Sequence, residues 1–310
     1  MANRPRWIKA GCVYSEVQRS VDRSFLFKPN EQIRQLIGSS AGRAQEKFPV
    51  LIYWLEFNIN HKHTSIAPLS KDPQHIHNVT EFHKLFNSLG AKGINKIIGR
   101  EGAVYSTNNR SVECIDESSM EQQLFYAVTN VVKDGLVDRV ADWKGFSSYK
   151  QLATGEEEKF HYIDYAAWKE AGGAQSGKKP EAFLKTTSVK LSPLPHWNGW
   201  PAHKRQAHFR REVRRIEQSF RDERERRNHR VLGPMKLAKL AHRDRPQNPP
   251  KRTKQPICHS STLDGAASYK ERFQSFLAQY YTASECWIQG NYHVEFPEGS
   301  FKPPYPRAQT

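Results

Sequence analysis

The segment that most constrains the fold of this chain is residues 50–58, VLIYWLEFN, which is dense in β-branched and aromatic residues. Residues of these types favour strands, so we expect a strand here. The segment runs directly into Asn60-His61-Lys62-His63 and then into TSIAPL, which also has the character of a strand. A strand of this kind needs a sheet around it, and it gives the two histidines a rigid platform.

The rest of the N-terminal part mixes short strands with amphipathic helices. Strand-like alternation occurs at residues 13–18 and 24–27, and helical spacing occurs at 31–45, 80–89 and 120–133. We expect the last of these helices to stop at Gly135, a typical C-terminal residue. The mixture predicts an α+β fold, an antiparallel sheet with packed helices, and not a doubly wound parallel sheet.

Positive charge is concentrated in one part of the chain. The formal net charge is +16, and residues 201–254 hold 18 Lys or Arg and 6 Asp or Glu, which leaves only +4 for the other 256 residues. Such a stretch favours a polyanionic partner, nucleic acid before an acidic membrane surface. We therefore divide the chain into an α+β domain at 1–155, a linker or irregular wrap at 156–200, a basic helical extension at 201–254, and a helix and tail at 255–310 that pack on the core.

Cysteine spacing and hydropathy exclude several classes of protein. The four cysteines are far apart and form no C-x-x-C pair, which argues against a zinc ribbon and against a disulfide scaffold. No window approaches the roughly 18 apolar residues of a membrane span, and the N-terminus lacks the apolar run of a signal peptide. We therefore expect a reduced, cytoplasmic protein that does not enter a membrane.

The two histidines His61 and His63 form a candidate metal site. Residues at i and i+2 of an extended segment point to the same face, so the two imidazoles can converge on one divalent ion. The pattern alone is weak, because it also occurs by chance on surface strands. A rival pair, His75 and His77, lies in the turn-rich stretch KDPQHIHN, where no strand fixes the rings. We interpret this rival as part of a solvated loop and prefer the first pair.

The helix expected at 120–133 carries a tyrosine and an asparagine one turn apart. Its apolar stripe should face the core and consists of Leu124, Phe125, Val128, Val131 and Val132. Tyr126 and Asn130 lie on the opposite, polar side, where residues four apart are neighbours. Spacing alone favours ordinary roles, with Tyr126 at the edge of the core and Asn130 in solvent. A functional role requires a partner, and the histidine pair supplies one.

Three blocks of the sequence resemble the REP-associated tyrosine transposases, small single-tyrosine members of the HUH endonuclease class. They are VYSEVQRSVDRSFLF, NHKHTSIAPL and YAVTNVVKDGLVDRVADWKGFSSY, with INKIIGREGAVYS between the second and the third. The third block is the specific one, because it follows the family's Y-x-x-x-N-P-V-K-x-G-L-V pattern and its W-x-x-S-S tail. The resemblance covers about residues 5–150.

The resemblance implies a ferredoxin-like HUH domain and a definite chemistry. The enzyme would cleave and rejoin single-stranded, hairpin-flanked DNA, with Tyr126 as the nucleophile and a 5′-phosphotyrosine intermediate. Mg²⁺ or Mn²⁺ would be held by His61, His63 and Asn130 and would polarise the scissile phosphate. Contacts to DNA are expected from Arg19, Arg23 and Lys133. The resemblance further implies a bacterial, nucleoid-associated protein that is a monomer or a homodimer.

Four residues depart from the family pattern. Lys62 stands where the family has a bulky apolar residue, and Val131, Ser15 and Tyr105 replace its usual proline, histidine and tryptophan. A buried lysine costs several kcal/mol unless it is paired or reaches water. These departures leave open an alternative, a DNA-binding protein on the same scaffold that cleaves poorly or not at all.

The basic region is predicted to contain a long helix at residues 203–228. One face carries Phe209, Val213, Ile216 and Phe220, and phosphate contacts are expected from Arg210, Arg211, Arg214 and Arg215. A solvated face laced with Glu–Arg pairs is the alternative, and it suits residues 222–227 better than 203–215. We expect Gly233-Pro234 to break the helix and residues 246–254 to be flexible. A third hypothesis, a basic RNA-binding protein, predicts no preference for DNA and no metal dependence.

Overall fold

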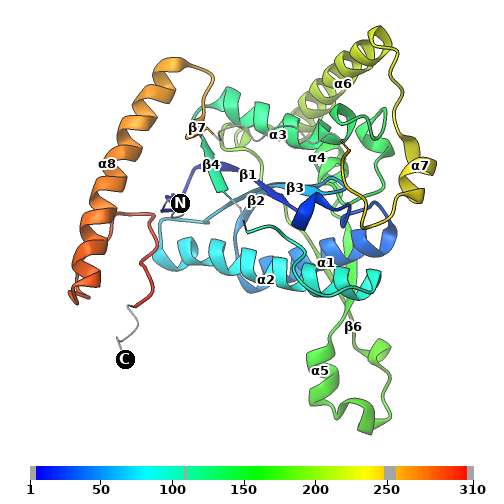
Figure 1. Ribbon diagram of the computed structural model, residues 1–310, viewed down its shortest axis with the longest axis horizontal. Coiled ribbons are helices and arrows are strands. Elements are labelled where there is room, and N and C mark those ends of the chain that lie inside the picture. Colours follow the sequence, from blue (N-terminus) through cyan, green and yellow to red (C-terminus); the bar gives the residue numbers. More distant parts are fainter. Residues whose placement is uncertain (1–4, 108–109, 248–255, 306–310) are drawn as a thin grey trace.

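The computed structural model describes residues 5–107, 110–247 and 256–305. Its centre is a five-stranded sheet in the order β2-β3-β1-β4-β7 (Figure 1). The first three pairings are antiparallel and β4–β7 is parallel, so the sheet is mixed where we expected it to be antiparallel. The α+β class predicted from the sequence is confirmed. The strands are β1 (Val13–Arg19), β2 (Leu51–Phe57), β3 (His61–Ala67), β4 (Arg110–Cys114) and β7 (Cys258–His259).

Strands β2 and β3 form the hairpin that carries the histidine pair. In both strands every residue after the first is buried. The strand expected at 24–27 is absent. Ser24 ends a 3-10 turn at Val21–Arg23, and Phe27 lies in a loop where its backbone N–H donates to Ile59 O at 3.0 Å. Phe25, Leu26 and Phe27 are apolar because they fill the core and not because they pair in the sheet.

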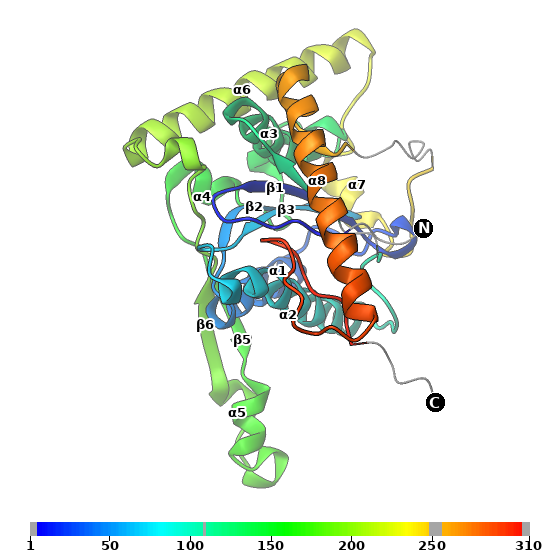
Figure 2. The same cartoon turned by 90° about the vertical axis from the view of Figure 1, so that its left-hand side faces the viewer.

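Helices cover both faces of the sheet. On one face lie α1 (Glu31–Lys47) and α2 (Pro73–Ile98), and on the other lie α3 (Glu117–Lys133) and α6 (Ala202–Arg226) (Figures 1 and 2). The core therefore fills two layers, one on each side of the strands. The short helix α4 (Tyr149–Thr154) connects α3 to the rest of the chain and packs against α6.

Helix α2 is much longer than the helix expected at 80–89. Asp72 accepts a hydrogen bond from Gln74 N at 2.8 Å, and Pro73 begins the helix. His75 and His77 therefore lie in the first turns of α2, which corrects their interpretation as loop residues. On a helix, residues two apart point about 200° away from one another, so these two rings diverge. Helix α3 ends before Gly135 (φ 68°), as predicted.

The region expected to be an irregular linker, 156–200, contains a second small sheet. Strands β5 (Lys159–Ile163) and β6 (Leu184–Ser188) pair antiparallel and lead to α5 (Tyr165–Glu170), and together they form an arm that projects from the body (Figure 2). The base of the arm packs on α1, where a Cβ added at Gly38 would lie 2.3 Å from the ring of Phe160. The sequence does not reveal these strands because they pair with each other and leave much of their surface in solvent.

The C-terminal part packs on the edge of the main sheet. Helix α8 (Leu263–Ile288) runs beside that edge (Figure 2), and its Tyr269 donates a hydrogen bond to Glu113 of β4 at 3.1 Å. Trp7 stacks on Phe276 with ring centroids 4.8 Å apart.

The helix break expected at Gly233-Pro234 occurs earlier in the chain. Gly233-Pro234 does not break α6, which ends at Arg226, but begins α7 (Gly233–Lys239). The flexible segment expected at 246–254 lies, from residue 248 on, outside the described residues. Within the described residues no helix combines the length and apolar composition needed to cross a membrane.

Candidate active site

The structure brings His61, His63, Tyr126 and Asn130 together on one face of the sheet. The alternation of β3 puts both histidines on the face covered by α3, with their ring centroids 4.9 Å apart. The Tyr126 ring meets the His63 ring edge to face at 5.5 Å. One turn further along α3, Asn130 Oδ1 lies 3.0 Å from His61 Nε2. These contacts join residues that are far apart in the sequence.

The exposure of the two α3 residues differs, and it corrects one expectation. Tyr126 is 41% exposed, whereas Asn130 is only 4% exposed and does not lie in solvent. Thr129, the residue before Asn130, is also buried and donates to Phe125 O at 2.7 Å. The helix is enclosed by the sheet and by α6, so more of its circumference is buried than the apolar stripe alone suggests.

The orientation of the Asn130 amide is fixed by a chain of hydrogen bonds that the sequence did not reveal. Ile59 N donates to Asn58 Oδ1 at 2.6 Å, which sets the direction of the Asn58 amide. Asn58 Nδ2 then donates to Asn130 Oδ1 at 2.7 Å and to Asp134 Oδ2 at 2.8 Å. Asn130 Oδ1 is therefore turned toward His61. The only local signal for Asn58 was its place directly after a buried strand.

Both ring nitrogens of His61 face amide oxygens. Nδ1 lies 2.7 Å from Asn60 Oδ1, and Nε2 lies 3.0 Å from Asn130 Oδ1. Burial lowers the pKa of His61 to about 4; its contact with Asn130 opposes this, and the charges of Arg19 and Lys133 act in the same direction as burial. The ring is therefore neutral at pH 7 and has a single N–H to donate. One ring nitrogen then faces an amide oxygen with its lone pair, and the two lone pairs repel each other. A cation bound between them would remove this repulsion.

His63 contributes a second nitrogen that needs a partner. Its Nε2 is buried and makes no hydrogen bond with the described residues. Burial, together with the neighbouring His61 and Lys133, lowers the pKa of His63 well below its usual value. Leaving a buried polar atom unpaired costs about 1–3 kcal/mol. Neutral imidazoles are ligands for divalent metals, so two imidazole nitrogens and the Asn130 oxygen fit a divalent cation.

The ligand set is small. Among the residues that the structure describes, no group of three or more His, Cys, Asp or Glu side chains is placed to hold a metal ion. A cation at this site would therefore take the Asn130 amide oxygen beside the two imidazoles and complete its coordination with oxygens from outside the chain. Two basic residues lie beside the candidate cation site. Lys133 Nζ lies 4.3 Å from the centre of the Tyr126 ring, and Arg19 is opposite His61 in the pairing of β1 with β3.

Lys62 points to the opposite face of β3 and is fully buried. Its Nζ donates to Asn87 Oδ1 of α2 at 2.5 Å and lies 4.4 Å from the centre of the Phe86 ring and 4.8 Å from that of Tyr105. Burial lowers the pKa of Lys62 to about 7, and the charge of Glu16 opposes that shift. The buried lysine is therefore paired, with a polar partner in Asn87 and aromatic rings beside its amine, which offsets part of the cost of burying it.

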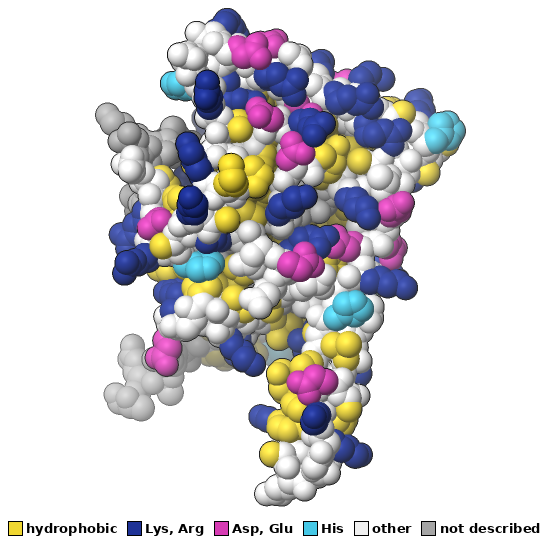
Figure 3. All heavy atoms as spheres, turned by 90° about the vertical axis from the view of Figure 1, so that its right-hand side faces the viewer, with side chains coloured by type: hydrophobic (Ala, Val, Ile, Leu, Met, Phe, Trp, Pro, Cys, Tyr) yellow, Lys and Arg dark blue, Asp and Glu magenta, His cyan; other side chains and the backbone are white. Residues whose placement is uncertain are grey.

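The arginines of α6 that were expected to contact phosphates are partly engaged within the protein. Arg210 donates to Ala153 O, and Arg211 and Arg215 both pair with Glu212, at 3.2 and 2.9 Å. Pairs of acid and base therefore occur in residues 203–215 as well as further along the helix. Lys and Arg side chains nevertheless gather over the upper part of the face shown in Figure 3, on the side that carries α6 and α7.

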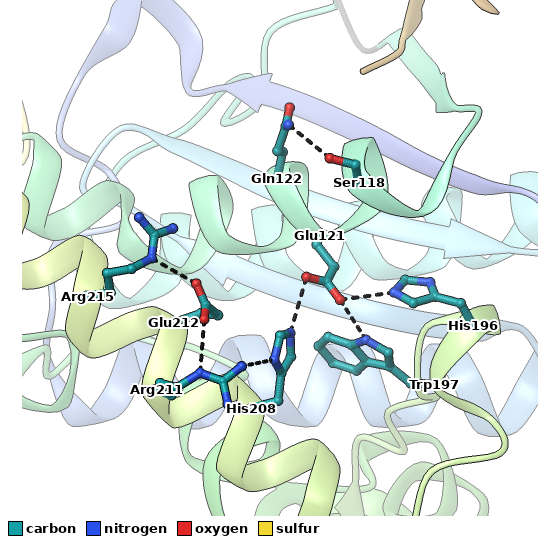
Figure 4. Close-up of polar contacts among 9 residues, drawn as sticks. All are labelled: Ser118, Glu121, Gln122, His196, Trp197, His208, Arg211, Glu212 and Arg215. Carbon is teal, nitrogen blue, oxygen red and sulfur yellow. Dashed lines mark hydrogen bonds and ion pairs between the residues drawn. The ribbon is translucent and has the colours of Figure 1, made fainter. Parts of the chain in front are cut away.

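Helix α3 is fastened to α6 by a cluster around Glu121, five residues before Tyr126 (Figure 4). The carboxylate of Glu121 accepts from Trp197 Nε1 at 2.8 Å and contacts His196 Nε2 and His208 Nε2, each at 3.1 Å. Burial of the carboxyl is outweighed by these contacts, so the pKa of Glu121 is lowered. This cluster holds the helix that carries Tyr126 in place above the histidines.

Comparisons with known proteins add one finding. No protein-family model matches the chain, and no curated protein matches it. Among solved structures, the chain is similar to a REP-associated tyrosine transposase that was solved bound to a REP hairpin. The two share 20% identity over 50% of this chain and 87% of the other, with a TM-score of 0.38. A likeness of this extent assigns no role to any residue.

Proposed function

We propose that this chain is a DNA transposase that cleaves and rejoins single-stranded DNA, with Tyr126 as the nucleophile and a divalent cation bound at His61, His63 and Asn130. One observation carries the proposal. Two neutral imidazoles and an oriented amide oxygen meet beside a solvent-accessible tyrosine, and one imidazole nitrogen is buried with no hydrogen-bond partner among the described residues. Mg²⁺ or Mn²⁺ is the cation we propose, and when bound it would stabilise the charge that develops on the phosphate.

The reaction is a transesterification that needs no water. Tyr126 Oη forms a bond to the phosphorus, the bond from phosphorus to the 3′-oxygen breaks, and the 5′-phosphate remains on the tyrosine. The phenolic proton passes to solvent, and the departing 3′-oxygen takes up a proton and becomes a hydroxyl. The reverse of the same step rejoins a strand. Lys133 and Arg19 place positive charge beside the anionic phosphate.

The residues around the site serve to hold its geometry. Asn58 orients the amide of Asn130, and Asn60 binds His61 Nδ1 and so leaves Nε2 available. The Glu121 cluster fixes α3, and therefore the distance between Tyr126 and His63. A hairpin-forming single strand as the partner, binding by Arg23 and the α6 arginines, and a bacterial, nucleoid-associated protein that is a monomer or a homodimer belong to the same proposal.

A second function is a DNA-binding protein on the same scaffold with weak or no cleavage. It is favoured by Lys62, which lies between the two histidines in sequence and carries a buried amine on the opposite face of β3, and by the small number of ligating side chains among the described residues. A positive charge near the proposed cation would weaken its binding. The two functions differ in whether a covalent protein–DNA adduct forms.

The decisive experiment is incubation of the protein with labelled hairpin-forming single strands and Mn²⁺, followed by a denaturing gel. An adduct that is lost in Tyr126→Phe and in His61→Ala is expected. Tyr165→Phe is the matched control, because Tyr165 is exposed to a similar extent, 45%, but begins helix α5 of the arm. Tight binding without any adduct across a library of hairpins would overturn the proposal in favour of the second function.

A further inference from the structure

A cavity of about 940 Å³ lies between the C-terminal end of α3 and the segment that joins α6 to α7. One wall is formed by Lys133 to Leu136, and the other by residues between Phe220 and Lys236. The helices α6 and α7 that form this second wall lie outside the part of the chain whose motifs predicted a nuclease. The cavity is therefore a feature that the proposed site does not use.

The lining of this cavity is strongly basic. Its acidic residues are Asp134 and Glu223, and its basic ones are Lys133, Arg224, Arg227, Arg230 and Lys236. Arg227 is paired with Glu223 at 2.8 Å, and Arg224 with Asp138 at 2.9 Å. Within the described part of the chain, Lys133, Arg230 and Lys236 form no ion pair, although the charge of Lys133 acts on the neighbouring Asp134 carboxyl. The excess of positive charge around the cavity predicts an anionic ligand.

The cavity also offers apolar surface. Leu136 is buried, and Phe220 and Leu232 are partly buried against the core while they line the cavity. An apolar floor with cations at its rim suits a ligand that has both a flat ring and a phosphate, because aromatic side chains stack on bases and cations bind phosphates. A nucleotide of a single strand combines these features, whereas a duplex keeps its bases stacked within itself.

The walls of the cavity are held by hydrogen bonds. Leu232 N donates to Gly135 O at 2.7 Å, and Gly233 N donates to Leu136 O at 3.0 Å. Arg224 reaches from α6 to the last turn of α3, where its Nη1 donates to Val132 O at 3.0 Å. The segment after α6 is thereby fastened to the end of α3. A preformed site of this kind binds without the cost of ordering a loop.

The cavity shares one residue with the candidate active site. Lys133 belongs to both, since it lines the cavity and its Nζ lies 4.3 Å from the centre of the Tyr126 ring. Asp134 also lines the cavity and accepts a hydrogen bond from Asn58, which orients Asn130. Lys133 follows Tyr126 by seven positions in α3, a rise of about 10 Å along the helix axis. Three stacked nucleotides of one strand span about the same length.

We infer that this cavity binds the unpaired DNA strand next to the phosphate that Tyr126 attacks, with Lys133, Arg230 and Lys236 on its phosphates and Phe220 under a base. The inference rests on the proposed function, because that function supplies the strand and its direction. It assigns to the α6–α7 segment the task of guiding the strand to the tyrosine, a task separate from cleavage.

The test uses the full-length chain with Tyr126→Phe, so that binding is measured without cleavage. Arg230→Gln with Lys236→Gln is compared with Lys71→Gln with Lys92→Gln, a matched pair of exposed lysines of which Lys92 lies on α2 and Lys71 just before it. Fluorescence anisotropy with an unstructured oligothymidine, and with a duplex, is measured over a series of salt concentrations.

The cavity pair should weaken binding of the single strand by about tenfold and lower the slope of log affinity against log salt by about 1.4, since each lost phosphate contact contributes about 0.7. The control pair should change neither quantity. Equal affinities and slopes in the two pairs, or an equal loss on the duplex, would overturn the inference. Failure of the proposed function looks different: no Tyr126 adduct forms in the native chain, although the cavity pair still weakens single-strand binding.

Discussion

Asn58 and Asn130 are joined by a hydrogen bond of 2.7 Å that connects the end of β2 to the last turn of the helix that carries Tyr126. The bond turns the Asn130 oxygen toward His61, so the candidate ligand set depends on a residue that does not belong to it. Partners of this type usually matter almost as much as the ligands. The relationship leads directly to a first prediction.

Asn58→Ala should weaken Mn²⁺ binding by about 10–100-fold, because the Asn130 amide loses the partner that orients it. The measurement is a Mn²⁺ titration followed by electron paramagnetic resonance, in the Tyr126→Phe protein. Asn198→Ala, at an exposed asparagine, is the control and should leave the affinity unchanged. Native Mn²⁺ affinity in Asn58→Ala would show that the hydrogen bond has no influence on the site.

Lys62→Met should stabilise the protein at neutral and acidic pH. The pKa of Lys62 is lowered to about 7 in the folded chain, so folding opposes its charged form. That cost is full below pH 7 and disappears as the pH rises toward 10.5, where the unfolded lysine also loses its proton. After subtraction of the lost bond to Asn87, we expect a gain of about 1–3 kcal/mol at pH 6. Urea unfolding at several pH values tests this, and a variant less stable than the native chain at pH 6 would contradict it.

Glu56→Gln should raise stability relative to the native chain as the pH rises from 4.5 to 8. Burial raises the pKa of Glu56 to about 8, although hydrogen bonds from Ser147 and Ser148 act against the shift. The folded chain therefore keeps a proton that the unfolded chain releases above its pKa of 4.5, and native stability falls as the pH rises from 4.5 to 8. Glutamine cannot ionise, so the free energy of unfolding of the variant should increase relative to that of the native chain over this window. Parallel pH profiles of the two proteins would disprove the assignment.

Gly38→Ala should destabilise the packing of the β5–β6 arm by about 1–3 kcal/mol, despite the better helix propensity of alanine. The added Cβ would lie 2.3 Å from a carbon of the Phe160 ring. Gly199→Ala is the control, since no atom lies within 4 Å of its Cβ position. Thermal unfolding of both variants, with limited proteolysis of the arm, provides the measurement. Equal stabilities of the two would mean that the arm adapts without cost.

Much of the main sheet could be predicted because its signals are local. The composition of 50–58, the i, i+2 spacing of His61 and His63, and Gly135 after α3 each depend on neighbouring residues only. The extent of α2 was missed because polar residues at its start, capped by Asp72, look like a turn. Strands β5 and β6 were missed because their partner is a segment about 25 residues away, with little apolar alternation in either.

The candidate site shows the same division between local and distant information. The sequence placed Tyr126 and Asn130 one turn apart, but whether Asn130 faces solvent depends on how α3 is covered by the sheet and α6. Asn58 and the cavity beside Lys133 depend on contacts between residues more than 70 positions apart, which no local pattern encodes. The catalytic and ligand roles themselves stay predictions.

The two-residue strand β7 has a consequence for the order in which the protein is made. During synthesis the N-terminal part folds first, because it leaves the ribosome first. Until residue 258 has emerged, β4 is an open edge of the sheet, able to pair with strands of other chains. The nascent chain therefore exposes this edge until residues 258 and 259 have emerged, and their pairing with Glu113 and Cys114 then covers the end of β4.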